Sequence, residues 1–264
     1  MIFNPIKLIY FLAPLSLALL IGCGKAAPEQ QTTPKVEPTK ATPTPGIEAA
    51  SKAYDEGRYA DAAMLYIAEL ATEEAKPVPS WVQLSYLNNE LGTTLHAARQ
   101  YDQALECYQK ALAIWLKQLG PDHAYVATSY NNIGAMHRKK AEYDKALEYH
   151  QKSLAIWLKK LGPDHPDVAT SYNNIGNVHN AKGEYDKALE YYQKDLAITL
   201  KQLGPDHPAV AISYHNIAFV YKAKKDLPKA KEYWEKAHAI LLKKLGPNHP
   251  HTKIVKGQLD ALNK

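Results

Sequence analysis

The stretch Leu119-Gly120-Pro121-Asp122-His123 decides the fold, because it returns at Leu161 and Leu203 and, as Leu-Gly-Pro-Asn-His, at Leu245. Each return comes 42 residues after the one before. The likeness extends through the whole interval, since segments 122–163 and 164–205 agree at 31 of 42 positions. Self-similarity at a fixed period of roughly 20–50 residues is typical of proteins that stack copies of one small structural unit.

The first part of each interval is predicted to be a helix. In segment 164–205, Tyr172, Ile175, Gly176 and His179 follow the spacing i, i+3, i+4, i+7, which places them on one buried helix face. Gly183 follows, and glycine is typical of the position just after a helix. His137 holds the place of His179 one period earlier, so we expect both histidines to be packed in the core.

A second helix is predicted after Gly183. Asp186 lies in its first turn, where a negative charge complements the helix dipole. The helix ends at Gly204-Pro205, and Asp206 is then expected to cap the next helix. Its buried face carries Ala188, Leu189, Tyr192, Leu196 and Leu200. Ala188 recurs as Ala62, Ala104, Ala146 and Ala230, which indicates a helix crossing too close for a larger side chain.

This pattern resembles the tetratricopeptide repeat, in the longer variant found in kinesin light chain. The matching residues are Asn-Asn-Ile-Gly at 131–134 and 173–176, Gly183, Tyr185, Ala188, and Tyr192 with its counterparts Tyr108 and Trp234. The resemblance implies an all-α fold, a right-handed α-solenoid of helix-turn-helix repeats. It would occupy 47–264, with about five helix pairs and a capping helix over 248–264. Asp195 and Ser153 depart from the pattern, because the family prefers alanine there.

Residues 1–22 are predicted to be a secretory signal peptide. Leu8–Ile21 is an apolar run that follows Lys7 and is interrupted by Pro14, so it is too short and broken for a membrane span of about 20 residues. The run ends at Leu20-Ile21-Gly22-Cys23, which resembles the bacterial lipobox. That resemblance implies cleavage before Cys23 and acylation of its side chain and new N-terminus. The alternative is a plain signal peptide that happens to end near a cysteine.

Residues 23–46 are expected to be a lipidated cysteine followed by a Pro/Thr-rich linker, because the composition cannot support a core. Such a linker would tether the repeats to the membrane. Gly24, rather than Asp, follows the cysteine, and the sorting rule of diderm bacteria then favours the outer membrane, facing the periplasm. The sequence therefore predicts a lipid-anchored protein of the bacterial cell envelope.

The composition and the repeat argue against several kinds of chemistry. A net charge of +5 with no basic run gives no support to nucleic acid as a partner. Histidines recur beside Asp or Asn at His123, His165, His207 and His249. Zinc needs all its ligands within about 2 Å, whereas packed helices are about 8–10 Å apart, so these histidines are expected to be polar turn residues and no metal or cofactor is expected. No catalytic motif is present, and we expect the protein not to be an enzyme.

Polar side chains follow the first helices. The resemblance implies that this side of each first helix lines a concave groove, in which amide side chains can donate to and accept from the backbone of a bound segment. The candidate partner-binding residues are Asn131, Asn132, Asn173, Asn174, Asn177 and Asn216. One alternative is that the inner series Asn132, Asn174 and Asn216 only bonds neighbouring helices. The functional prediction is a scaffold that binds an unidentified protein or peptide, and its alternative is a self-associating structural or assembly factor of the envelope.

Overall fold

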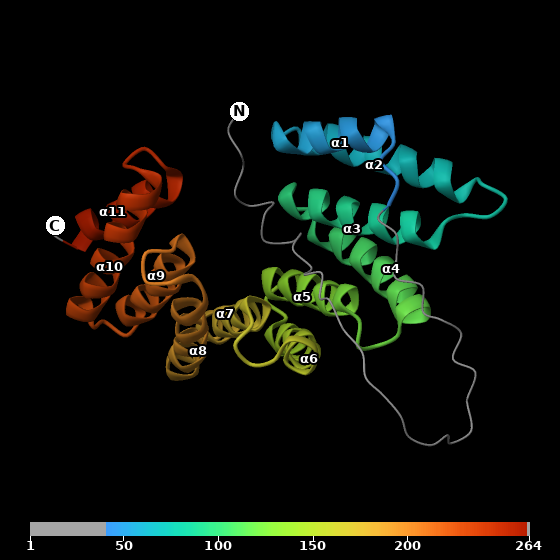
Figure 1. The fold of residues 1–264 in the computed structure, drawn as a ribbon. Coiled ribbons are helices and arrows are strands. Elements are labelled where there is room, and N and C mark those ends of the chain that lie inside the picture. Colours follow the sequence, from blue (N-terminus) through green and yellow to red (C-terminus); the bar gives the residue numbers. More distant parts are fainter. Residues whose placement is uncertain (1–40, 263–264) are drawn as a thin grey trace, which may run out of the picture. The chain divides into compact units, whose positions relative to one another are not determined.

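The structure, a computed structural model, describes residues 41–262, and within them the chain forms eleven α-helices (Figure 1). The first helices of successive pairs are α1 (Pro45–Asp55), α3 (Trp81–Ala97), α5 (Ala124–Lys139), α7 (Pro166–Ala181) and α9 (Pro208–Ala223). The second helices are α2 (Tyr59–Glu74), α4 (Tyr101–Leu119), α6 (Tyr143–Leu161), α8 (Tyr185–Leu203) and α10 (Leu227–Leu245). The last helix is α11 (Pro250–Leu262).

Each helix packs mainly against the helices before and after it in the chain, so the fold is an array of helix-turn-helix pairs. The expected helix pairs and the final helix are therefore confirmed. One boundary differs from the expectation, because α1 begins at Pro45, inside the segment predicted to be a linker. The Thr44 hydroxyl caps α1 by accepting a hydrogen bond from the backbone N–H of Ile47.

The turn within each pair requires one residue with a positive φ. Gly183 has φ of +79°, as its place just after α7 predicts. At the equivalent position the other pairs have Gly57, Arg99, Ala141 and Lys225, with φ between 60° and 77°. Three of the five pairs thus keep this backbone conformation without glycine, although a side chain strains it by about 1–2 kcal/mol.

The turn between pairs differs from the prediction, because a histidine and not an aspartate caps the next helix. His165 Nδ1 accepts the backbone N–H of Asp167 at 3.2 Å, and His207 Nδ1 accepts that of Ala209 at 3.2 Å. The prediction that Asp206 caps α9 is therefore wrong. Asp206 instead pairs with Lys243 at 2.6 Å, in the second helix that follows.

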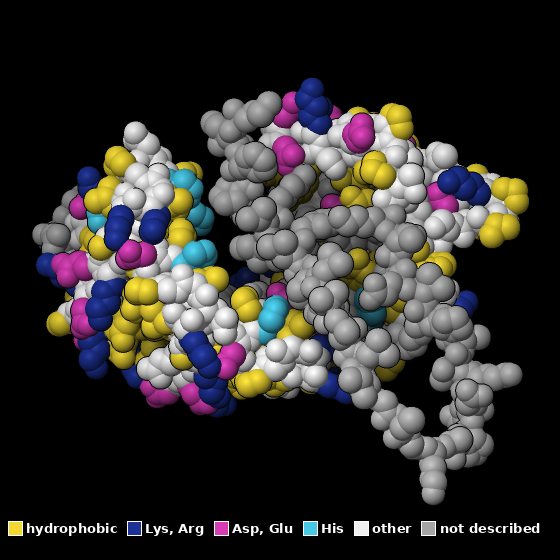
Figure 2. Space-filling model, viewed as in Figure 1, with side chains coloured by type: hydrophobic (Ala, Val, Ile, Leu, Met, Phe, Trp, Pro, Cys, Tyr) yellow, Lys and Arg dark blue, Asp and Glu magenta, His cyan; other side chains and the backbone are white. Residues whose placement is uncertain are grey.

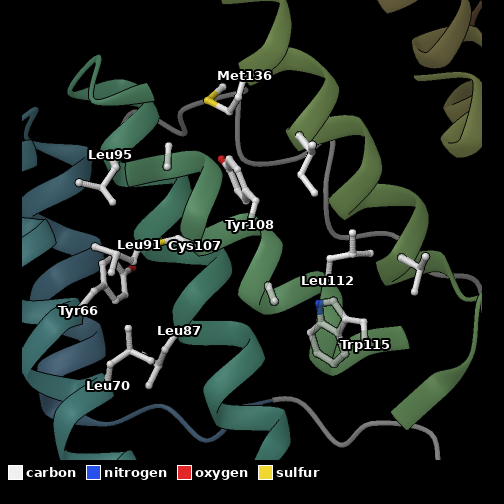
Figure 3. Close-up of a cluster of buried hydrophobic side chains, with 14 of the residues drawn as sticks. Tyr66, Leu70, Leu87, Leu91, Leu95, Cys107, Tyr108, Leu112, Trp115 and Met136 are labelled. Carbon is white, nitrogen blue, oxygen red and sulfur yellow. The ribbon is translucent and has the colours of Figure 1, made fainter. Parts of the chain in front are cut away.

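The helices of a pair cross closely. The alanines Ala62, Ala104, Ala146, Ala188 and Ala230 are all completely buried, as the sequence predicts. Facing each crossing, a glycine of the first helix meets a ring of the second: a Cβ on Gly92 would lie 2.9 Å from the Tyr108 ring, and one on Gly176 would lie 2.7 Å from the Tyr192 ring. Figure 3 shows Tyr108 among the buried side chains of α2 to α5.

His137 and His179 are buried, as expected. Each ring stacks on a tyrosine of the next helix at an interplanar angle of 11°, Tyr149 for His137 and Tyr191 for His179. The Nδ1–H of His179 donates to Glu184 at 2.7 Å. His137 makes the equivalent bond to Glu142 at 2.8 Å, so packing and this bond account for both histidines.

Cys23 and the rest of the signal and linker up to residue 40 lie outside the described residues, so their predicted roles stay predictions. Among the helices of residues 41–262, none has both the length and the apolar character that crossing a bilayer requires.

Candidate functional site

The candidate site is the face formed by partly exposed side chains of the first helices, which we call the first-helix face. Neighbouring first helices are joined directly, since the amide of Asn174 on α7 donates to the carbonyl oxygen of Asn131 on α5 at 2.7 Å. All six asparagines predicted to bind a partner are partly exposed. From α5 to α11 the face comprises Thr128, Asn131, Asn132, Arg138, Thr170, Asn173, Asn174, Asn177, Ile212, Asn216, Phe219, Lys222, Ile254 and Gln258.

Asn131 connects three helices. Its carbonyl oxygen accepts from Asn174 and from the Nδ1–H of His150, on α6, at 3.1 Å. His150 is 1% exposed, and burial lowers its pKa to about 4. The ring is therefore neutral at pH 7 and donates one hydrogen bond, which fixes the Asn131 side chain in place.

Asn173 and Asn177 are tied to the second helix of their own pair. The amide of Asn173 donates to Asp195 at 3.2 Å, and Asn177 donates to the carbonyl oxygen of Asn173 at 3.0 Å. The Tyr192 hydroxyl donates to Asn177 at 2.8 Å. These bonds hold both side chains in one orientation. Because the side chains are already ordered, binding a segment costs less conformational entropy.

Hydrogen bonds accommodate Asp195 at a buried position where the repeat pattern prefers alanine. The carboxylate is buried, and burial raises its pKa. It accepts hydrogen bonds from Ser213, on the next first helix, at 2.6 Å and from Thr199 at 3.2 Å, in addition to that from Asn173. Asp195 thus joins two repeats beneath the first-helix face. Ser153, one period earlier, is also completely buried, and its hydroxyl has no partner among the described residues.

The inner series Asn132, Asn174 and Asn216 was predicted either to bind a partner or only to bond neighbouring helices, and its members differ in this respect. Asn132 donates to Asn89 at 3.4 Å, and Asn174 donates to Asn131, so both join neighbouring first helices. Their carbonyl oxygens, and both polar atoms of the Asn216 amide, make no side-chain hydrogen bond within residues 41–262. The face therefore retains acceptors on Asn132 and Asn174 and both a donor and an acceptor on Asn216.

Towards α9 and α11 the face becomes apolar. Ile212 is 42% exposed, Phe219 37% and Ile254 51%, and Figure 2 shows hydrophobic and histidine side chains gathered over these helices. Neither isoleucine is among the residues that the sequence predicted to bind a partner. The 42-residue period was the available signal, because Ile212 and Ile254 take the place of Thr128 and Thr170.

The rings around Phe219 are held rigidly. Phe219 meets the Trp234 ring edge-on, with centroids 5.4 Å apart, and Trp234 donates its Nε1–H to His215 Nδ1 at 3.1 Å. Burial lowers the pKa of His215 to about 4, so its Nδ1 can accept this bond at neutral pH. Lys222 lies over the Trp234 ring at 5.6 Å and donates to Gln258 on α11 at 3.1 Å.

The outer surface of the second helices is different in character. Glu148–Lys152, Glu190–Lys194 and Glu232–Lys236 form exposed ion pairs, each 2.6 Å long, as the i, i+4 spacing predicts. Each lysine also lies about 5 Å from the centre of a tyrosine ring on the same helix. Within residues 41–262, no three His, Cys, Asp or Glu side chains are placed to hold one metal ion.

The repeats match a known family. The sequence fits the tetratricopeptide repeat model over residues 83–157, 125–199 and 167–243, which together span more than half of the chain. The chain therefore belongs to the tetratricopeptide repeat family, whose fold is a scaffold that is typically non-catalytic and binds proteins. No match was found among curated proteins.

Solved structures agree with this assignment. BtubC (BKLC) from P. vanneervenii is 25% identical, with a TM-score of 0.65 over 76% of this chain and 80% of its own. A putative kinesin light chain of P. anserina with nearly identical TPR-like repeats is 26% identical, with a TM-score of 0.64 over 76% of this chain and 94% of its own. Aspartyl phosphate phosphatase F from Bacillus subtilis, 15% identical with a TM-score of 0.69 over 83% of this chain and 54% of its own, shares the fold alone.

Proposed function

We propose that the protein is a membrane-anchored scaffold that binds a segment of a partner protein on the first-helix face. One observation carries the proposal: this face combines hydrogen-bonding amides held in fixed orientations with exposed apolar side chains. Asn132, Asn174 and Asn216 offer polar groups to a partner backbone, and Ile212 and Phe219 offer contact area. A single hydrogen bond contributes only about 0.5–1.5 kcal/mol, so binding should depend on several of these residues together.

Photo-crosslinking in cells tests where the partner binds. A photoreactive residue at Phe219 should trap a discrete adduct, and the same residue at Glu190, on the outer surface of α8, serves as the matched control. Mass spectrometry of the adduct then identifies the partner. Equal adducts at both positions, or an adduct only at Glu190, would contradict a site on the first-helix face.

Substitutions within the repeat pattern test the apolar contacts without disturbing the fold. Ile212→Thr and Phe219→Asn introduce the residues that the previous repeat has at Thr170 and Asn177. The double variant should reduce capture of the identified partner at least tenfold and keep the helical circular-dichroism signal, although its thermal midpoint should fall because Phe219 packs against Trp234. The triple variant of Asn132, Asn174 and Asn216 to Ala should abolish capture while the helical circular-dichroism signal stays intact. Unchanged affinity in both variants would show that the partner binds elsewhere.

The membrane anchor is part of the proposal and rests on the lipobox-like stretch that ends at Cys23. A Cys23→Ala protein should leave the membrane fraction, and Cys107→Ala is the matched control because that thiol is buried in the repeats. Membrane binding that is equally strong in both variants would argue against acylation at Cys23. Separation of inner from outer membranes would then test the expected outer-membrane location.

A further inference from the structure

The outer surface of α2 differs from that of every other second helix. Its exposed residues from Ala60 to Ala71 are Ala60, Met64, Ile67, Ala68 and Ala71, which we call the α2 stripe, and polar Thr72 and Glu74 are exposed beyond it. At the first four of these positions α4 has Asp102, Glu106, Gln109 and Lys110, and α6 has Asp144, Glu148, Gln151 and Lys152, all exposed. Met64 is 62% exposed and Ile67 53%, and Figure 2 shows hydrophobic side chains over the α1–α2 repeat.

We propose that the α2 stripe is a homodimer interface, in which α2 packs antiparallel against α2 of a second copy of the chain. The order of residues is symmetric about the middle of the helix, with spacings of four, three and four from Ala60 through Met64 and Ile67 to Ala71. In an antiparallel pair Met64 lies opposite Ile67 of the second copy, and Ala60 lies opposite its Ala71. Small residues at both ends allow the two helices to approach closely. A two-fold interface requires a surface that complements itself in this way.

Charge favours the same arrangement. Arg58, just before α2, pairs with Glu56 and Asp61 of its own chain but keeps a half-exposed guanidinium, and Glu74 at the far end of α2 is exposed. An antiparallel pair places each Arg58 near Glu74 of the other copy, whereas a parallel pair would bring like charges together. A lipid surface is a poorer occupant, since Tyr59–Glu74 contains four acidic residues and no basic one, and anionic lipids would repel it.

The dimer should be weak and concentration-dependent, because one helix pair buries less than the roughly 1,200–2,000 Å² of a stable interface. It is also independent of the proposed partner site, since it uses a second helix and leaves the first-helix face open. A failure of either proposal therefore leaves the other untouched.

Sedimentation equilibrium of the full-length chain, with detergent micelles in molar excess over protein, measures the association. The mass should rise from monomer towards dimer with concentration. Met64→Glu/Ile67→Gln introduces the residues found at Glu106 and Gln109, so the fold should be kept, and the dimer dissociation constant should rise at least tenfold. Ile212→Thr/Ile254→Thr removes two exposed isoleucines elsewhere and should leave the association unchanged.

A charge reversal tests the antiparallel arrangement. Arg58→Glu and Glu74→Arg should each weaken the dimer several-fold, and the double variant should restore it because both interchain pairs are then reversed together. A monomer at every concentration would overturn the proposal. A dimer that Met64→Glu/Ile67→Gln leaves intact, or one that the double charge reversal fails to restore, would overturn it as well.

Discussion

At the scale of single residues, the fold depends on contacts that leave no room for a methyl group. Gly176 on α7 faces the Tyr192 ring, and an added Cβ would lie 2.7 Å from a ring carbon, closer than atoms pack. Both residues are buried, so neither can move into solvent. A side chain at position 176 must therefore displace the ring or separate the two helices.

Gly176→Ala should lower the free energy of unfolding by about 1–3 kcal/mol, the usual cost of overpacking a core. Gly257→Ala is the matched control, because Gly257 lies within α11 and an added Cβ there meets no atom within 4 Å. It should raise stability by up to about 1 kcal/mol through helix propensity. Chemical denaturation of both variants checks the prediction, and equal midpoints would show that the α7–α8 crossing is looser than described.

His150 should make stability depend on pH. An exposed histidine in the unfolded chain binds a proton near its ordinary pKa of about 6.5, whereas burial lowers the pKa of His150 in the folded protein to about 4. The unfolded state then binds more protons between these values, so stability falls as pH decreases from about 6.5 towards 4. The loss between pH 7 and pH 5 should be roughly 1–2 kcal/mol for this residue.

His150→Tyr measures that contribution. Tyrosine occupies the same position as Tyr108 and Tyr192, and Gly134 leaves the same space opposite position 150 that Gly176 leaves opposite Tyr192. The variant should lose less stability than the parent between pH 7 and pH 5. Because His215 also has a lowered pKa, some pH dependence should remain. Identical pH profiles for both proteins would contradict the assignment to His150.

Single residues also mark the limit of what the sequence could predict. The period placed six asparagines along the first helices, and all six are partly exposed as required. Their hydrogen bonds could not be predicted, because they depend on distances between helices that the sequence does not contain. Asn131 and Asn173 illustrate this, since the first bonds across repeats and the second bonds to Asp195 within its own repeat.

At the scale of helices, α5, α7 and α9 each begin after a histidine cap, whereas the sequence predicted an aspartate cap for α9. Aspartate is a common cap, so the choice followed ordinary preference. His165 can cap α7 because its Nδ1 is as many bonds from Cα as a carboxylate oxygen of aspartate is. It is also the extended residue directly before α7, with φ of −80° and ψ of 145°. Asp164 lies one residue too early and pairs with Lys201 at 2.5 Å instead.

Substitutions at these two neighbouring positions distinguish the capping residue. His165→Ala should lower the free energy of unfolding by about 0.5–2 kcal/mol, and His165→Ser should retain most of the stability because serine is itself a good cap. Asp164→Ala should cost at most about 1 kcal/mol, since its ion pair is exposed. Thermal denaturation of the three variants is the measurement. A larger loss of stability for Asp164→Ala than for His165→Ala would show that the aspartate, and not the histidine, caps α7.

At the scale of the whole repeat domain, the period alone predicted the succession of helices. Each helix packs mainly on its neighbours in the chain, so local pattern and tertiary contact carry the same information. The final helix was predicted as well. Asp260, in the place of Gly176 and Ala218, is exposed, and a polar outer face suits the end of an array. The α2 stripe was not predicted, because the early repeat was recognised by buried residues that recur in the later repeats, such as Ala62, and not by its surface.

An array held together by neighbour contacts should accept another copy of its own unit. Duplicating residues 164–205 in tandem creates only one new junction, Pro205 followed by Asp164, which reproduces the native junction of Pro163 and Asp164. The added repeat can form the equivalent contacts: Lys201 pairs with Asp164 within each copy, and Lys182 of the second copy meets Asp186 of the first, as Lys224 does in the native array. Each added neighbour interface should raise the stability of the array.

The duplicated protein should therefore unfold at a higher denaturant midpoint and with a larger m-value, because more surface becomes exposed on unfolding. Deleting residues 164–205 should change both quantities in the opposite direction and leave the remaining helices intact. As a control, duplicating 165–204 breaks the 42-residue period and should destabilise the array. A midpoint that did not respond to the number of repeats would indicate that the helix pairs unfold independently, without the stabilising contacts between them.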